Sequence, residues 1–190
     1  GPDCGTAIIS GVGLGFANVV RRGSVGIVAS AGTGLQEVSC IISNSGYGIS
    51  HAIGTGSRDL SSEVGGLMTL RALELLSEDD STEVLVLVSK PPSLEVQRKV
   101  FEKIEREIKK PCVACFLGTT SFQKLSDRLY TVETLEEAAY AAIALLNGEE
   151  PKRIDFTIPS ERISELVESE ASKKRKGQRY VRGLFSGGTL

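Results

Sequence analysis

The sequence is poor in several features that mark large classes of protein. It has no Trp, one His and six Pro among 190 residues, and its formal net charge is only −2. A chain with so little positive charge is unsuited to holding phosphate backbones, so we expect no nucleic-acid partner. Its apolar runs fall short of the roughly 18 residues that a membrane-spanning helix requires, and it has no signal-peptide pattern. We therefore expect a cytoplasmic protein without a membrane partner.

Cysteine is also scarce. Cys4, Cys40, Cys112 and Cys115 have neither the density nor the spacing of a secreted disulfide framework. Cys112 and Cys115 have CxxC spacing, but they lie inside an expected strand, so a buried structural role is favoured over a redox role. Because the sequence has no second Cys pair and no His cluster, we expect no metal site.

What the sequence does have is an alternation of short apolar runs and amphipathic segments. The apolar runs predict five strands, at residues 24–32, 49–53, 83–88, 112–117 and 129–132. The amphipathic segments predict helices that begin near Thr33, after Ser61 or Ser62, after Ser93 and after Thr134. This alternation suits right-handed βαβ crossovers. It predicts an α/β fold with a flavodoxin-like, doubly wound parallel sheet of five strands flanked by helices.

The two ends of the chain differ from this central domain at residues 24–148. Residues 1–23 carry many glycines among small apolar residues, which predicts an irregular or hairpin lead-in that packs on the domain. Residues 149–190 contain a helix-like stretch, a basic run at 173–176 and a glycine-rich end. They predict a C-terminal tail, made of a linker and the start of a truncated following domain.

Small and hydroxyl residues follow four of the expected strands. Ligands of open parallel sheets bind beyond the carboxyl ends of the strands, where helix N-termini offer N–H groups to anions. We therefore expect a small anionic substrate, a phosphate or carboxylate. The candidate binding residues are Ser30, Gly32, Thr33, Gly34, Gly54, Thr55, Gly56, Ser57, Arg58, Lys90, Gly118 and Thr119. For any single loop, the simpler interpretation is that small residues only make a short turn.

Sharper catalytic motifs are missing. Residues 32–37 lack the third glycine of a dinucleotide fingerprint, and no Walker-type sequence occurs. His51 lies inside the second expected strand. A strand histidine is usually structural, but an imidazole there could also be a phosphoryl carrier or a general base. Both interpretations of His51 stay open, and no catalytic residue is assigned.

Taken together, these segments resemble the second domain of succinyl-CoA synthetase α subunits and NDP-forming acyl-CoA synthetases, and more closely still the FdrA family. Residues 1–4, Gly-Pro-Asp-Cys, are similar to the Gly-Pro-Asn-Cys segment that opens the synthetase domain. Residues 23–33 are similar to its Gly-x-Val-Gly-Ile-Val strand and following turn. The FdrA likeness is most specific at residues 48–60, 89–92 and 182–190.

The resemblance has consequences for ligands and chemistry. It implies CoA or acyl-CoA as a ligand, with Cys4 near the thiol end, a nucleotide as a second ligand, and homo- or hetero-oligomers formed through flanking domains. The phosphorylated histidine of the synthetases has no counterpart, because residues 118–124 read Gly-Thr-Thr-Ser-Phe-Gln-Lys. The resemblance also implies that the family's CoA-binding domain is absent and that this chain alone lacks complete ligase chemistry.

Three functions remain open. The first is an acyl-CoA synthetase domain of an FdrA-type protein that binds an anion at the strand ends. The second, implied by the FdrA likeness, is a subunit of an oxamate carbamoyltransferase in allantoin (purine) catabolism. The third is a non-catalytic module that binds acyl-CoA or supports assembly.

Overall fold

The computed structural model describes residues 5–154, 158–180 and 182–184. The chain divides into two compact units, one ending at Lys152 and the other spanning Arg153–Ser186. The second unit contains helix α5 (Ser160–Ser172), none of whose residues is buried. The expected start of a following domain lies largely outside the described residues. Within the described ranges, no helix is both long and apolar enough to cross a membrane.

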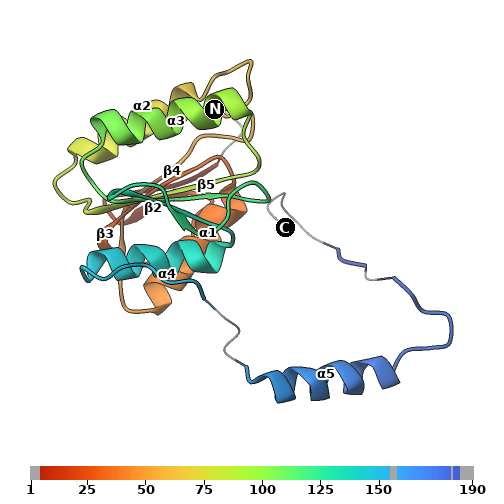
Figure 1. The fold of residues 1–190 in the computed structure, drawn as a ribbon. Helices are drawn as coiled ribbons and strands as arrows, with labels where there is room; N and C mark the ends of the chain where they lie inside the picture. The colour runs from red at the N-terminus through yellow and green to blue at the C-terminus, as the bar shows by residue number, and fades with distance from the viewer. Residues whose placement is uncertain (1–4, 155–157, 181, 185–190) are drawn as a thin grey trace. The chain divides into compact units, whose positions relative to one another are not determined.

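The first unit alternates strands and helices along the chain (Figure 1). Its elements are β1 (Thr6–Ile9), β2 (Val12–Gly15), β3 (Arg22–Ala29), α1 (Gly32–Asn44), β4 (Ile49–Gly54), α2 (Leu67–Glu78), β5 (Val84–Ser89), α3 (Leu94–Glu107), β6 (Cys112–Phe116), β7 (Gln123–Lys124), β8 (Leu129–Val132) and α4 (Leu135–Leu146).

These strands form one sheet with the order β2-β1-β4-β3-β5-β6-β8-β7. The five central strands, from β4 to β8, are parallel. Numbered along the chain, the parallel strands have the order 2-1-3-4-5, which is the flavodoxin-like order. The predicted doubly wound α/β fold is therefore confirmed.

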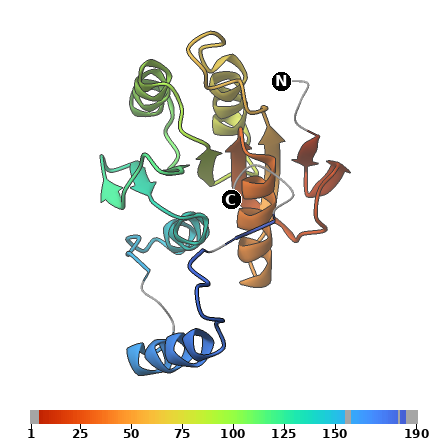
Figure 2. The ribbon, with the colours of Figure 1, turned by 90° about the vertical axis from the view of Figure 1, so that its right-hand side faces the viewer.

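Over the part of the chain that the structure describes, the sheet has eight strands rather than the five predicted. The lead-in forms a β1–β2 hairpin whose turn uses positive φ at Ser10 and Gly11, and β1 pairs antiparallel with β4. At the other end, β7 pairs antiparallel with β8. Figure 2 shows the red hairpin at one end of the sheet and the turquoise β7–β8 pair at the other. The two-residue β7 is too short to show an alternating pattern in the sequence.

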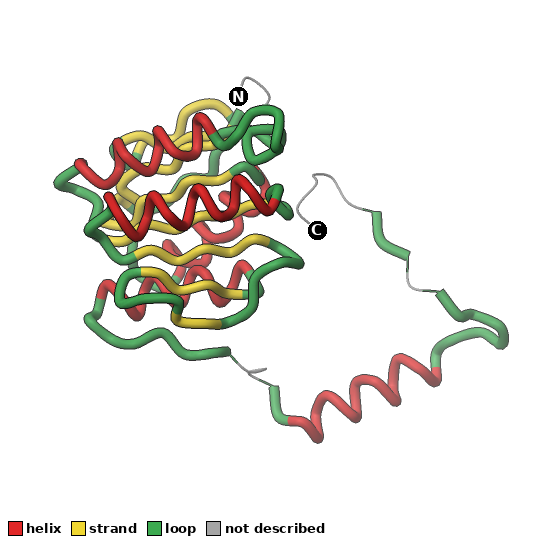
Figure 3. The backbone as a smooth tube through the Cα atoms, turned by 45° about the horizontal axis from the view of Figure 1, so that its top comes forward, coloured by secondary structure: helices red, strands yellow, loops and turns green. Residues whose placement is uncertain are grey.

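Helices cover both faces of the sheet (Figure 3). The core beside α1 and α4 contains Leu35, Val38 and Ala138, and the core on the other face contains Leu73, Val100 and Ile104 from α2 and α3. Strand β5 is buried along its whole length, as its run of Val and Leu predicts.

Helix α2 begins later than the sequence predicted, so the expected caps Ser61 and Ser62 are wrong. Its N-cap is Gly66, which has a φ of 74° and no capping side chain of its own. A Cβ at Gly66 would lie 2.9 Å from Val96 Cγ1, so glycine is required there by both backbone and space. Two N–H groups of the first turn, those of Met68 and Thr69, donate instead to Asp59, seven residues before the N-cap.

Candidate functional site

The carboxyl ends of β3 and β5 mark the point where the chain reverses its direction of winding. Ser30 and Ser89, one from each strand end, are both buried, and their Oγ atoms lie 2.6 Å apart. Ser89 Oγ also donates to the Lys90 carbonyl at 2.6 Å, so Ser30 supplies the proton between the two serines. The loop after β4 is held beside the end of β3 by a hydrogen bond from Thr55 N to the Ala29 carbonyl at 2.8 Å. The structure therefore brings these predicted residues to one edge of the sheet.

Helix α1 starts directly at this edge. Its N-cap, Ala31, provides no side-chain hydrogen bond, and its first turn contains no acidic residue. The predicted residues Gly32, Thr33 and Gly34 form that first turn. The positive end of the α1 dipole therefore lies at the winding reversal, and its own N-cap and first turn contain no acidic side chain, an arrangement suited to an anionic group.

Helix α2, in contrast, already has a carboxylate at its N-terminus. Asp59 Oδ1 accepts a hydrogen bond from Met68 N at 2.9 Å, and Asp59 Oδ2 accepts from Thr69 N at 2.8 Å and Thr69 Oγ1 at 2.6 Å. Asp59 is 4% exposed. This carboxylate occupies the place that an external anion would take, so the predicted anion site is better matched by the N-terminus of α1 than by that of α2.

The loop after β4 contains both structural and exposed candidates. Thr55 is fully buried, and its hydroxyl contacts the Ala29 carbonyl and Thr69 Oγ1. Gly54 ends β4, and Gly56 has a φ of 88°. Ser57 and Arg58 are exposed. Of these residues, Ser57 and Arg58 are the ones whose side chains can reach a ligand.

The loops after β5 and β6 complete the edge. Lys90 is half-buried and follows Ser89 directly. Gly118 has a φ of 75°, and the exposed Thr119 uses its hydroxyl to donate to the Phe116 carbonyl at 3.0 Å. Arg58 and Lys90 therefore supply the positive side chains of the predicted site, and Thr119 mainly shapes its turn.

His51 lies upstream of the strand ends, inside β4. Its Nδ1 accepts a hydrogen bond from Ser10 N at 3.2 Å, and its Nε2 lies 3.6 Å from Asp79 Oδ2. Burial raises the pKa of Asp79, but hydrogen bonds from Thr82 and Ser81 and the charge of His51 outweigh burial and lower it. Asp79 follows α2 and precedes β5, so His51 faces the amino ends of the parallel strands. Both imidazole nitrogens thus have partners away from the edge described above.

Of the four cysteines, Cys112 and Cys115 are buried, and Cys40 on α1 is partly exposed. Cys4 lies outside the described ranges. Burial raises the pKa of both Cys112 and Cys115 to about 12, which keeps the thiols protonated. Among the described residues, no group of three His, Cys, Asp or Glu side chains is placed to hold a metal ion.

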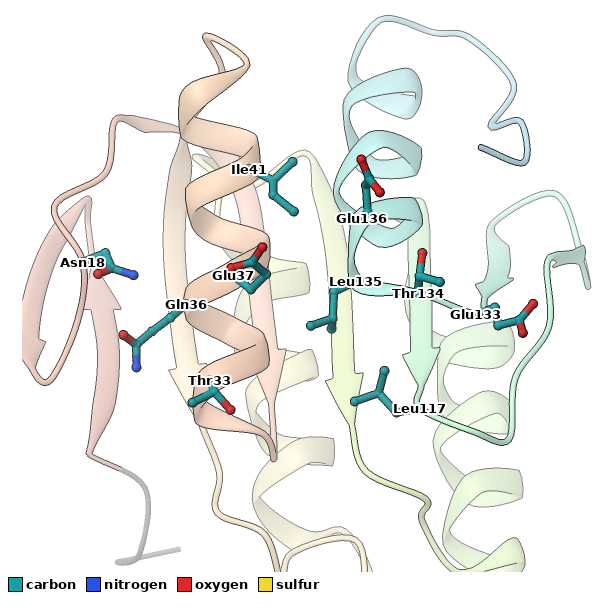
Figure 4. Close-up of a pocket in the computed structure, with 10 residues that line it drawn as sticks. All are labelled: Asn18, Thr33, Gln36, Glu37, Ile41, Leu117, Glu133, Thr134, Leu135 and Glu136. Carbon is teal, nitrogen blue, oxygen red and sulfur yellow. The ribbon is translucent and has the colours of Figure 1, made fainter. Parts of the chain in front are cut away.

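A groove of about 860 Å³ lies beside the predicted edge, between α1 and α4. Its lining residues are Asn18, Thr33, Gln36, Glu37, Ile41, Leu117, Glu133, Thr134, Leu135 and Glu136. Figure 4 shows the α1 side chains along one wall and residues at the start of α4 along the other. Thr33 belongs both to this groove and to the first turn of α1, so the groove adjoins the predicted anion site. Sequence reasoning missed the groove because its walls come from distant parts of the chain.

Two curated proteins are similar to this chain in sequence. It is 44% identical over 190 residues to the uncharacterized protein YahF of Escherichia coli (strain K12), covering 100% of the chain and 36% of YahF. It is 31% identical over 124 residues to the succinate–CoA ligase [ADP-forming] α subunit of Aquifex aeolicus (strain VF5), covering 64% of the chain and 39% of that subunit. The chain thus spans less than two fifths of the length of these relatives.

A solved structure shares the fold. The structure of ATP citrate lyase from Methanothrix soehngenii, in complex with citrate and coenzyme A, aligns with this chain at a TM-score of 0.58. The alignment covers 96% of this chain and 36% of the lyase chain. The sequence identity is 17%, so this similarity concerns the fold alone.

The family match corrects one expectation. The resemblance to the second synthetase domain implied that the CoA-binding domain is absent, whereas residues 20–116 match the CoA binding domain family. Residues 23–33 did not distinguish the second synthetase domain from the CoA-binding domain. A buried strand followed by a glycine-rich turn and a helix is common to many nucleotide- and cofactor-binding α/β domains. With the match spanning more than half of its length, the chain belongs to the CoA binding domain family.

Proposed function

We propose that this domain binds coenzyme A or an acyl-CoA at the carboxyl edge of its parallel sheet, as the ligand-binding part of an acyl-CoA synthetase-like protein. The observation that carries the proposal is the N-terminus of α1. It lies at the winding reversal, its N-cap Ala31 makes no side-chain hydrogen bond, its first turn contains no acidic residue, and it belongs to a chain of the CoA binding domain family. Phosphate groups are suited to such a helix end.

The surrounding residues fit a ligand of this class. The first turn, Gly32 to Gly34, would hold a phosphate group, with Arg58 and Lys90 adding charge from the neighbouring loops. The buried Ser30–Ser89 hydrogen bond would hold the two central loops in place before the ligand binds. Binding would then cost little conformational entropy in these loops. CoA would supply the thiol that carries an acyl group.

Calorimetry on the 190-residue chain tests the proposal. We expect CoA to bind more tightly than dephospho-CoA, and pantetheine, which has no phosphate, to bind most weakly. Arg58→Ala and Lys90→Ala should each raise the Kd for CoA about fivefold at low ionic strength. Each substitution removes one positive charge that attracts the phosphates of CoA through water. Arg98→Ala, on the exposed side of α3, is the matched control. Equal binding of CoA and pantetheine would contradict the proposal.

The finer assignment to an FdrA-type protein concerns the reaction that follows binding. A ligase should consume ATP or GTP when CoA and a carboxylic acid are present. An oxamate carbamoyltransferase subunit should instead release phosphate from carbamoyl phosphate and oxamate. A chain that binds CoA and supports neither reaction, alone or with the remaining parts of its protein, would be the non-catalytic module.

A further inference from the structure

We infer that the groove between α1 and α4 receives the uncharged pantetheine arm and acyl group of the ligand, and that it disfavours acyl groups carrying a second carboxylate. This inference rests on the proposed function, because it requires a CoA-type ligand at the N-terminus of α1. It concerns the class of acyl group that the domain accepts.

The position of the groove supplies the first step. Thr33 lies in the first turn of α1 and also lines the groove, and Leu117 follows β6 at the same edge of the sheet. A ligand with phosphates at the α1 N-terminus therefore has the groove as an adjoining space. The volume of about 860 Å³ lies in the usual range for small-molecule sites.

The chemistry of the walls supplies the second step. Glu37 on α1 and Glu136 on α4 line opposite walls and are exposed, and Glu133 lines the same groove. Among the described residues that line the groove there is no Lys, Arg or His. Ile41, Leu117 and Leu135 provide apolar surface between the polar groups.

These walls decide which end of CoA can enter. The negative charges of CoA are concentrated on the phosphates at its nucleotide end, whereas the pantetheine arm carries only amides, a hydroxyl and the thiol. Phosphates beside Glu37 and Glu136 would be repelled, but the neutral arm would not. The amides of the arm can bond to Gln36 and Asn18, and an alkyl acyl chain can contact the apolar residues.

The same charges set the preference among acyl groups. Butyryl and succinyl groups have the same number of carbons, but succinyl ends in a carboxylate. At low ionic strength we expect succinyl-CoA to bind about fivefold more weakly than butyryl-CoA, because the carboxylates repel through water. Since Glu37 and Glu136 are exposed, this ratio should fall towards one in high salt.

Calorimetric titration of the chain with CoA, butyryl-CoA and succinyl-CoA tests the inference. In the double variant Glu37→Gln, Glu136→Gln the succinyl penalty should be largely lost, and Glu37→Lys should reverse it. For each variant the Kd of succinyl-CoA is divided by the Kd of butyryl-CoA, so that a general change in affinity for the CoA part cancels. Glu102→Gln, an exposed position of α3 on the opposite face of the sheet, should leave the ratio unchanged. Circular dichroism confirms that each variant is folded.

The outcomes separate the two proposals. If CoA binds and the ratio between succinyl-CoA and butyryl-CoA is one in the native chain, or is the same in the Glu37 and Glu136 variants, the groove does not receive the acyl end. If CoA itself does not bind, the proposed function fails and the inference fails with it.

Discussion

Ser30 and Ser89 join the loops after β3 and β5 through a buried hydrogen bond of 2.6 Å between their Oγ atoms. Ser89→Ala removes the acceptor of the Ser30 proton and the donor to the Lys90 carbonyl, so we expect a loss of about 1–3 kcal/mol in the free energy of unfolding. Ser30→Ala should cost less, about 1 kcal/mol, because Ser89 keeps its bond to Lys90. Urea denaturation measures both, and the exposed Ser62→Ala should change little. Equal values for all three variants would show that the pair is not stabilising.

Asp59 closes the N-terminus of α2 from a distance along the chain. Asp59→Ala leaves Met68 N and the buried Thr69 N without their acceptor, so we expect a loss of about 1–3 kcal/mol in the free energy of unfolding. Asp59→Asn retains one carbonyl oxygen and should be intermediate. Thermal and urea denaturation report the difference. A stable Asp59→Ala variant would mean that water replaces the carboxylate.

Cys112 and Cys115 should not react with alkylating reagents in the folded protein. Burial raises the pKa of both thiols from 9.0 to about 12, so neither forms a thiolate at pH 8. Peptide mapping after iodoacetamide treatment should find both unmodified in the native chain and modified in urea, with the half-exposed Cys40 as the accessible reference. Native labelling of Cys115 would contradict its burial.

The same thiols give stability a dependence on alkaline pH. In the unfolded chain they ionise above about pH 9, whereas the folded chain keeps them protonated until about pH 12. The unfolded state is therefore favoured as the pH rises above about 9. Urea denaturation should give a lower free energy of unfolding at pH 10 than at pH 8. In Cys112→Ala this difference between the two pH values should be smaller. The same decrease in the variant would assign the effect to other groups.

Asp79 should contribute to the acid sensitivity of the fold. Its pKa lies below the ordinary value of 3.8, because hydrogen bonds from Thr82 and Ser81 and the charge of His51 outweigh burial. Its stabilising contribution is therefore present above about pH 4 and is lost as the pH falls through the lowered pKa. Asp79→Asn should be less stable than the native chain at pH 7, and the difference should shrink at pH 3. A constant difference at both pH values would argue against titration of Asp79.

Regular elements were predictable from the sequence where the pattern is local. The Val and Leu run of β5 signals burial on both faces, and Thr134 caps α4 as expected, with its Oγ1 accepting from Glu137 N at 3.1 Å. The five parallel strands follow from such local patterns, and the right-handedness of the crossovers limits the orders in which they can pair, the flavodoxin-like order being one of them.

Features that depend on distant residues were not predictable. The cap of α2 comes from Asp59, which lies beyond a loop whose serines imitate a local cap. The walls of the groove, represented by Glu37 and Glu136, become neighbours only after α1 and α4 pack on the same face. The loops that carry the candidate binding residues lie at one edge of the sheet, as their positions after the strands predicted. The burial of Thr55 could be recognised only in three dimensions.

The bonds of Asp59 also determine how Arg58 behaves. Asp59 N donates to the Gly56 carbonyl at 3.2 Å, Gly66 N donates to the Asp59 carbonyl at 2.8 Å, and the carboxylate is anchored in α2. The peptide that carries the guanidinium is thus immobilised before any ligand arrives. Recruiting this cation costs only the rotamer freedom of one side chain, about 0.5–1.5 kcal/mol, with no additional loss of main-chain entropy.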